Sequence, residues 1–297
     1  MTDLLGSVMD AMRAAGMAPS DPSRLRFDGV LCRFDSDDDK RGKRNAWCVV
    51  FPDGQRPVVT FGHWARGIRE TVVLGSSEPM TAAEREKQRI AVEQAKAARE
   101  SQLRHLHELA RREANVQWRE SMPANEHHPY LLRKGVTSVG ARERGGFLLV
   151  PLRDDQGRIC NLQRIRADGQ KRFLRGGRVQ GLYACLGGPV DQHVVVCEGW
   201  ATGKSLHAAT GLPVAIAFSA GNLMAIAQTM RGKYPAARIT VAADNDLKPD
   251  GSNPGVSAAT AAAHAIAGYV AVPPIAGDFN DYAAHSGADT FCEADDA

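Results

Sequence analysis

The fold is decided by two stretches of sequence, Val194-Val195-Val196-Cys197-Glu198-Gly199 and Ile239-Thr240-Val241-Ala242-Ala243-Asp244-Asn245-Asp246. Each is a short apolar run that ends at acidic residues, the pattern of a buried strand. Because side chains alternate along a strand, Asp244 and Asp246 are expected to point the same way and Asn245 away from them. If the two strands are neighbours in a parallel sheet, Glu198, Asp244 and Asp246 gather at one edge. Three such carboxylates repel one another unless a divalent cation neutralises them, so the pattern predicts a metal site of the kind that handles phosphates.

The region around these stretches alternates between strand and helix patterns. Strands are expected at 194–198, 213–218, 238–244 and about 269–272, with helices at about 201–210, 222–231 and 255–267. This alternation predicts an α/β fold with a mainly parallel sheet flanked by helices. A third acidic stretch, Gly277-Asp278-Phe279-Asn280-Asp281-Tyr282, follows the last strand. Asp278 and Asp281 are predicted to join the metal ligands, and the alternative is that they cap a helix or a turn.

A competing motif overlaps the first stretch. Gly199-Trp200-Ala201-Thr202-Gly203-Lys204-Ser205 is similar to a phosphate-binding P-loop. A P-loop needs four residues between its first glycine and Gly-Lys. Here Glu198 occupies the position of that glycine, and its carboxylate would repel a nucleotide. We therefore expect no P-loop, and we expect Lys204 to be a solvated residue on the first turn of a helix.

Composition limits the class of protein. The chain has 297 residues, of which 43% are hydrophobic and 24% charged, as in soluble globular proteins. The formal net charge is only +3, so affinity for nucleic acid must come from local clusters of charge. We find no signal peptide and no run long enough to span a membrane, so no membrane partner is expected. The scattered cysteines form no CxxC pair, which indicates a cytoplasmic protein with reduced thiols and no zinc.

Four parts can be distinguished along the chain. A hairpin pattern, Trp47–Phe51 and Val58–Phe61 around Pro52-Asp53-Gly54, predicts a small β-rich N-terminal module. Residues 81–122 contain neither glycine nor proline and are rich in helix formers, which predicts a solvated helical connector. The predicted divisions are 1–78 for the module, 79–122 for the connector, 123–190 for a basic α+β subdomain and 191–297 for the domain that carries the acidic stretches.

Basic residues concentrate just before the acidic strands. Residues 163–178 contain six Lys or Arg and a single acid, Asp168. Such a basic ribbon suits the phosphates of nucleotides or of a nucleic-acid backbone, and the alternative is an exposed hairpin without a ligand. Farther upstream, aromatic and basic side chains alternate in Phe61–Arg66, which suits stacking on bases, although a buried Trp64 fits equally well. The residues expected to bind nucleotides or nucleic acid are Arg164, Lys171, Arg172, Arg175, Arg178, Trp64 and Arg66.

These motifs carry a resemblance to a known family. Glu198-Gly199, Asp244-Asn245-Asp246 and Asp278-Phe279-Asn280-Asp281 resemble the acidic motifs of a Toprim domain, which occurs in DnaG-type primases, topoisomerases and some nucleases. Phe147–Leu152, Gln163-Arg164, Lys171–Leu174 and Gly181–Tyr183 resemble elements of the primase core in the same order. Residues 124–285 are most similar to the Toprim primases of conjugative plasmids, integrative elements and phages, and 26–75 to their N-terminal module. The resemblance implies a Toprim-like, Rossmann-like sheet preceded by a mixed α+β primase core.

The resemblance implies DNA primase activity, that is, synthesis of short RNA primers on single-stranded DNA by metal-dependent nucleotidyl transfer. Glu198, Asp244 and Asp246 would be catalytic and hold Mg²⁺ or Mn²⁺, with ribonucleoside triphosphates as substrates. Unlike replicative primases, the chain shows no zinc ribbon and ends soon after the Toprim region. Template choice and helicase coupling are therefore expected to need a separate partner, such as a replicative helicase.

Two alternative functions share these motifs. A Toprim metal-dependent nuclease would use the same acids without nucleoside triphosphates. A non-catalytic accessory protein of a mobile element would bind single-stranded DNA without needing the acids, and the intact acidic motifs argue against it. A topoisomerase is disfavoured because a longer chain with a catalytic tyrosine domain would be expected.

Overall fold

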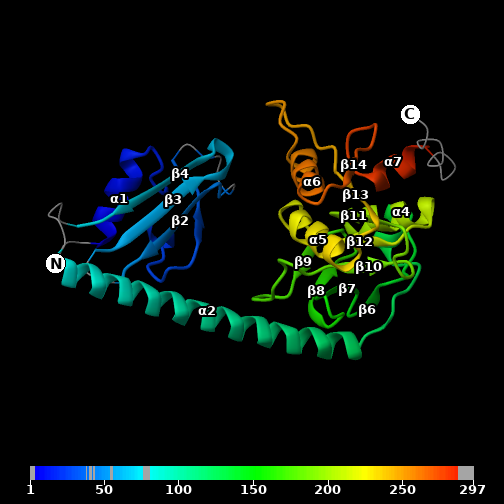
Figure 1. Cartoon of the computed structure of the whole chain (residues 1–297), viewed down its shortest axis with the longest axis horizontal. Helices are drawn as coiled ribbons and strands as arrows, with labels where there is room; N and C mark the ends of the chain where they lie inside the picture. The colour runs from blue at the N-terminus through cyan, green and yellow to red at the C-terminus, as the bar shows by residue number, and fades with distance from the viewer. Residues whose placement is uncertain are drawn as a thin grey trace. The chain divides into compact units, whose positions relative to one another are not determined.

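The structure is a computed structural model that describes residues 4–286, apart from 38, 40, 41, 43, 54, 55 and 76–80. The chain forms two compact units, Met1–Leu103 and Arg104–Ala297 (Figure 1). The four-part division expected from composition is finer than this and stays a prediction. Among the described residues, no helix is both long enough and apolar enough to cross a bilayer.

The first unit is an antiparallel sheet covered by a helix. Strands β1 (Cys32–Phe34), β2 (Ala46–Phe51), β3 (Val58–His63) and β4 (Ile68–Val73) pair in chain order, so the predicted hairpin is confirmed. Alternate residues of β2 are buried, as expected of a sheet with one covered face. That face packs on Val8 and Met12 of α1 (Leu4–Ala14). Single-turn 3-10 helices at Pro22–Arg24 and Trp64–Arg66 complete the unit.

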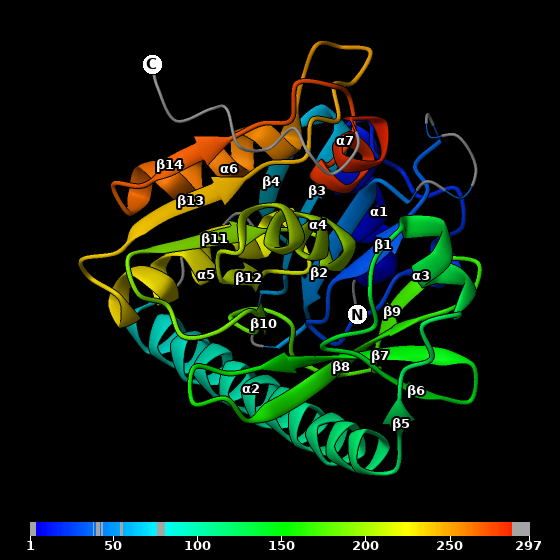
Figure 2. The same cartoon turned by 90° about the vertical axis from the view of Figure 1, so that its right-hand side faces the viewer.

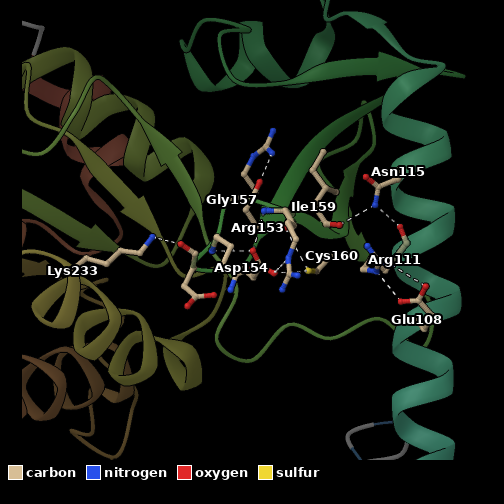
Figure 3. A network of polar contacts seen from close by, with 12 residues as sticks. Glu108, Arg111, Asn115, Arg153, Asp154, Gly157, Ile159, Cys160 and Lys233 are labelled. Atoms are coloured by element: carbon tan, nitrogen blue, oxygen red, sulfur yellow. Dashed lines mark hydrogen bonds and ion pairs between the residues drawn. The ribbon is translucent and has the colours of Figure 1, made fainter.

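The long helix α2 (Ala82–Arg119) confirms the helix predicted from the stretch without glycine or proline. Leu103, Leu106 and Leu109 are exposed, as expected of a solvated connector. The last turns differ, because Ala114 is fully buried in a small apolar cluster within the second unit. Figure 3 shows the adjacent Asn115, whose Nδ2 donates to the carbonyl oxygen of Ile159 at 2.9 Å. The small alanine side chain lets the helix approach the sheet closely there.

An antiparallel sheet opens the second unit. Its order is β5 (Met122–Pro123), β6 (Arg142–Arg144), β7 (Phe147–Arg153), β8 (Ile159–Ile165) and β9 (Lys171–Phe173). The short helix α3 (Pro129–Lys134) lies between β5 and β6 in the chain. The two strands predicted at 147–152 and 159–165 form the centre of this sheet, joined by the expected turn at Asp154–Gly157.

A mainly parallel sheet follows and confirms the predicted fold class. Its order is β10 (Ala184–Leu186), β12 (Val214–Ile216), β11 (His193–Cys197), β13 (Arg238–Ala242) and β14 (Tyr269–Ala271). Only β10, which sequence analysis did not predict, runs antiparallel to its neighbour. Helices α5 (Ala220–Lys233) and α6 (Pro254–Ala265) cover one face, and α4 (Trp200–Thr210) and α7 (Phe279–Ser286) lie on the other (Figures 1 and 2).

The two sheets of the second unit share one hydrophobic core. A single cluster of buried residues joins Leu148 and Val150 of β7 to Cys197 of β11 and Trp200 of α4. The predicted boundary near residue 190 is therefore no break in the packing. This shared core holds the basic strands against the parallel sheet.

Candidate metal centre

The acidic residues Glu198 and Asp244 are brought together by strand pairing. β11 and β13 are hydrogen-bonded neighbours in parallel register, with Cys197 opposite Ala242. Glu198 follows β11 directly, and Asp244 follows β13 by two residues. The prediction of a shared acidic edge required the two strands to be neighbours, and their pairing is thus confirmed.

The environment of these carboxyl groups disfavours their charge. Burial, together with repulsion from Glu198, Asp278 and Asp246, raises the pKa of Asp244 to about 7. Burial also raises the pKa of Glu198, with Asp246 contributing and a hydrogen bond from the backbone N–H of Ala220 acting in the opposite direction. The Oδ1 atom of Asp244 is buried and accepts no hydrogen bond. The positive charge of Lys171 favours the ionised form of both carboxyls but does not offset burial and mutual repulsion.

Asn245, between the two aspartates in the sequence, contacts the loop that follows β14. β13 has ended by this point, and Asn245 instead forms an isolated bridge with Gly277 through two backbone hydrogen bonds. Its Nδ2 donates to the carbonyl oxygens of Pro273 and Ile275, both at 3.1 Å. Asn245 thereby fastens the loop that leads to Asp278. Sequence analysis missed this role, although an amide between two acids was a visible signal.

Asp278 and Asp281 cap helix α7. Asp278 Oδ1 accepts from the backbone N–H groups of Asn280 and Asp281, and its Oδ2 accepts from Thr202 Oγ1 at 3.0 Å. Asp281 accepts from the backbone N–H of Asp278 and pairs with Lys134 at 3.2 Å. Burial opposes the charge of Asp281, but these two contacts lower its pKa. The capping alternative is thus present in the structure, and the metal roles of both residues stay predictions.

One cation of the basic ribbon reaches the acidic edge. Antiparallel pairing of β8 with β9 sets Ile165 opposite Lys171 and Arg164 opposite Arg172. Because opposite residues share a face of the sheet, Lys171 lies on the face of the buried Ile165, away from the two arginines. Desolvation and the nearby Lys134 lower the pKa of the Lys171 ammonium, whose side chain remains partly exposed, while Asp278, Asp244 and Glu198 act in the opposite direction. Its Nζ lies 5.8 Å from the ring centre of Tyr130.

The other basic residues of the ribbon lie elsewhere. Arg164 stacks on Phe147, with its Cζ 4.3 Å from the ring centre, and Arg172 shares that face. Arg175 and Arg178 are exposed. Arg178 is close enough to His107 of α2 to help burial lower the pKa of that imidazole. The structure thus divides the ribbon and brings only Lys171 near the acids.

The aromatic element of the first unit is exposed. Trp64 keeps 50% of its surface accessible and packs against Trp47 with ring centres 5.8 Å apart. The Arg33 guanidinium lies 4.6 Å from the Trp64 ring centre. The backbone N–H of Arg66 donates to His63 Nδ1. The alternative of a buried Trp64 is therefore wrong, and its exposed ring beside arginines is suited to stacking.

The stretch that is similar to a P-loop forms no loop. Helix α4 begins at Trp200, directly after Gly199. The prediction that Lys204 is solvated is wrong, because it is 6% exposed and its Nζ donates to the Val139 carbonyl oxygen at 3.1 Å. The segment between α3 and β6, which contains Val139, therefore covers this side of α4.

Phe218 is a residue of the site that sequence analysis also missed. Its φ of 66° lies in the left-handed region, which is uncommon for a residue other than glycine. Its backbone N–H donates to the carbonyl oxygen of Glu198 at 2.8 Å, and its ring meets Phe173 edge-on at 6.1 Å. Phe218 therefore links the acidic edge to the strand that carries Lys171.

The acidic residues fit a divalent cation by their chemistry. Carboxylate oxygens are the donors that hard divalent cations prefer, and the unpartnered Asp244 Oδ1 would gain a partner. Within the described part of the chain, however, no three His, Cys, Asp or Glu side chains are drawn together closely enough to hold a metal ion. Binding of a cation would have to draw the carboxylates closer than they lie here.

The parallel sheet with its acidic edge belongs to a known class of domain. Residues 193–289 match the family model of the Toprim domain. The Toprim resemblance inferred from the acidic motifs is thereby confirmed for this region. The chain is also similar to two proteins of Escherichia coli named DNA primase TraC. One is 29% identical over 266 residues, which are 86% of this chain and 25% of that protein. The other is 27% identical over 288 residues, 92% of this chain and 20% of that protein.

The chain thus spans a quarter or less of the length of these curated relatives. Among solved structures, it is similar to the primase fragment of the bacteriophage T7 primase-helicase protein. The two are 19% identical with a TM-score of 0.42, and the match covers 54% of this chain and 70% of that one.

Proposed function

We propose that this chain is a DNA primase that synthesises short RNA primers on single-stranded DNA from ribonucleoside triphosphates. The observation that carries the proposal is that Glu198 and Asp244 follow the paired strands β11 and β13, close enough to Lys171 to affect its pKa. Ligands of open α/β sheets bind beyond this edge. The similarity to proteins named DNA primase supports the same activity.

The proposed reaction is nucleotidyl transfer. The 3′-hydroxyl oxygen of one ribonucleotide attacks the α-phosphorus of the next, and the bond to pyrophosphate breaks. Mg²⁺ or Mn²⁺, held by Glu198, Asp244 and Asp246, would neutralise charge on the phosphates and orient them. Lys171 would contact the triphosphate. Glu198, whose pKa is raised by burial, is the residue that we assign to accept the hydroxyl proton.

The remaining basic and aromatic residues suit the template. Arg164, Arg172, Arg175 and Arg178 would contact the phosphate backbone of single-stranded DNA. In the first unit, Trp64 would stack on a base of the template and Arg66 would contact its backbone, as in other proteins that bind single strands. A separate replicative helicase is the partner that we expect to deliver the template.

The test is ribonucleotide incorporation on single-stranded DNA with Mg²⁺ or Mn²⁺, with the products sized on a gel. Asp244→Asn and Glu198→Gln should each reduce incorporation at least a hundredfold. Asp250→Asn is the matched control, because this exposed acid caps a nearby loop through Ser252 and should retain activity. Full incorporation by either site variant would refute the assignment. Metal-dependent cleavage of DNA without incorporation would instead favour the nuclease.

The division of the basic ribbon makes a second comparison possible in the same assay. Lys171→Gln should raise the KM for the nucleoside triphosphate, since Lys171 faces the acids. Arg172→Gln removes the same charge from the adjacent residue on the opposite face. It should weaken binding of the template with little effect on that KM.

A further inference from the structure

A pocket in the unit formed by residues 104–297 is lined by none of the residues of the acidic edge. Its volume is about 290 Å³, and the last turns of α2, strands β6, β7 and β10, and the start of α4 contribute to its wall. The lining residues that matter for its chemistry are Trp118, Arg142, Arg153, Cys185 and Trp200. No aspartate or glutamate of the described chain is among its lining residues.

Two guanidinium groups share one aromatic ring in this pocket. The Cζ atoms of Arg142 and Arg153 lie 5.1 and 6.0 Å from the ring centre of Trp118. Each guanidinium donates to a backbone carbonyl. Arg142 donates to Trp118 at 2.9 Å, and Arg153 donates to Gly157 at 2.8 Å, as Figure 3 shows. Contact with the ring holds both groups in place and leaves further N–H donors on each.

These two arginines differ from their neighbours in lacking a counter-charge. Arg144, on the same strand as Arg142, pairs with Glu120 at 2.7 Å, and Arg158 pairs with Asp154 at 2.8 Å. Within the described ranges, neither Arg142 nor Arg153 forms an ion pair with a carboxylate. Both residues line the pocket, so an anion bound there would supply the counter-charge that each lacks.

Trp200 also lines the pocket. The residue is 1% exposed, and its indole Nε1 has no hydrogen-bond partner. A buried donor without a partner costs free energy, and an acceptor that reached Nε1 would recover it. Trp200 is also only two residues from Glu198, so an occupant of the pocket would lie beside the helix that follows the acidic strand.

We propose that this pocket binds a phosphate group, with Arg142 and Arg153 as its ligands. Guanidinium groups match the geometry of phosphate oxygens and bind them through paired hydrogen bonds. The volume lies at the lower limit of ligand sites, so it admits inorganic phosphate, pyrophosphate or one backbone phosphate rather than a whole nucleotide. This binding goes beyond the proposed primase activity and does not depend on it.

Cys185 provides a built-in reporter of occupancy. It lines the pocket and is exposed, whereas the four other described cysteines are buried. Desolvation raises the pKa of its thiol, while the positive charges of Lys233 and Arg153 act to lower it. Cys292 lies outside the described residues, so the measurement is made in a Cys292→Ser background.

The experiment measures the rate at which uncharged N-ethylmaleimide modifies Cys185 in the full chain. Pyrophosphate, inorganic phosphate and a short single-stranded oligonucleotide are added in separate arms, each without divalent metal. Protection by pyrophosphate or phosphate assigns the site to a free anion, and protection by the oligonucleotide alone assigns it to a backbone phosphate. At least one ligand is expected to slow modification fivefold or more.

The variants decide whether the protection arises in the pocket. Arg153→Gln and Arg142→Gln should each abolish it, with circular dichroism confirming that the chain remains folded. Arg238→Gln is the matched control, since Arg238 also stacks on an aromatic ring, that of Tyr269 at 4.5 Å, but lies outside the pocket. Absence of protection by every ligand would overturn the proposal. So would protection that survives in folded Arg153→Gln, or protection that Arg238→Gln loses equally.

Discussion

Replacing Asn222 with alanine should destabilise the second unit strongly. Asn222 is fully buried at the start of α5. Its Oδ1 accepts from the Gly181 N–H at 2.8 Å, and its Nδ2 donates to the carbonyl oxygens of Leu182 at 2.9 Å and Ala217 at 2.8 Å. One side chain thus fastens the segment before β10 to the end of β12.

The size of the effect follows from these three bonds. Each buried hydrogen bond contributes on the order of 1 kcal/mol, and an orphaned buried group costs a comparable amount. Asn222→Ala should therefore lower the free energy of unfolding by about 3 kcal/mol. With a slope typical of urea denaturation, the midpoint should fall by roughly 1 to 2 M.

The assay is urea unfolding followed by tryptophan fluorescence. Trp47→Phe and Trp64→Phe substitutions in the background leave Trp118 and Trp200, which report on the second unit alone. Asn115→Ala is the control, because this exposed amide also donates to two carbonyl oxygens but water can replace it. Asn115→Ala should cost less than about 1 kcal/mol. An equal loss in the two variants would refute the reasoning from burial.

Two further predictions concern the backbone at the acidic edge and the pH dependence of stability. A Cβ added at Gly255 would lie 2.5 Å from the carbonyl oxygen of Asp244, so Gly255→Ala should displace Asp244 and reduce primer synthesis at least tenfold. Burial opposes the charge of Asp154, but hydrogen bonds from Arg158 and the backbone outweigh it and lower the pKa of this carboxyl. Its contribution to stability is therefore complete above the unfolded pKa of about 4 and is lost as the pH falls through the lowered folded value. Urea midpoints measured from about pH 6 to pH 2 should show this loss in the parent chain, and Asp154→Asn should remove it.

Each of these predictions has a control, in another helix for Gly255 and in the same turn for Asp154. Gly232→Ala in α5 meets nothing within 4 Å and should leave primer synthesis unchanged. If it impairs synthesis as much as Gly255→Ala does, contact with Asp244 is not the cause. The exposed neighbour Asp155→Asn should change stability by less than about 0.5 kcal/mol at neutral pH. A pH profile that is unaltered in Asp154→Asn would contradict the role assigned to its hydrogen bonds.

Local patterns were sufficient to predict much of the fold. The apolar runs before Glu198 and Asp244 became β11 and β13, and the stretch without glycine or proline became α2. These predictions succeed because an apolar run or a helical period depends on residues close together in the chain. Strand β10 was not predicted because three residues are too few to show the alternation of a strand. Its antiparallel pairing depends on β12, a later segment of the chain.

Properties that depend on partners distant in the chain could not be predicted in this way. The sequence pattern predicts a solvated Lys204, yet its side chain is buried. The carbonyl of Val139, 65 residues away in the chain, accepts its hydrogen bond. Asn245 sits between two acids in the sequence, but its function depends on carbonyl groups of the loop that follows β14. Periodicity carries no information about such contacts.

The sequence by itself determined which acidic residues follow the two apolar strands and that six basic residues precede them. Those facts are local, because strand, turn and charge patterns each involve a few neighbouring residues. Only the tertiary structure decided that Lys171 alone among the six reaches the acids, since the register of β9 on β8 sets which side chains share a face. It also raised the pKa of Asp244 to about 7, because burial and the charges of Glu198 and Asp278 come from segments far away in the chain.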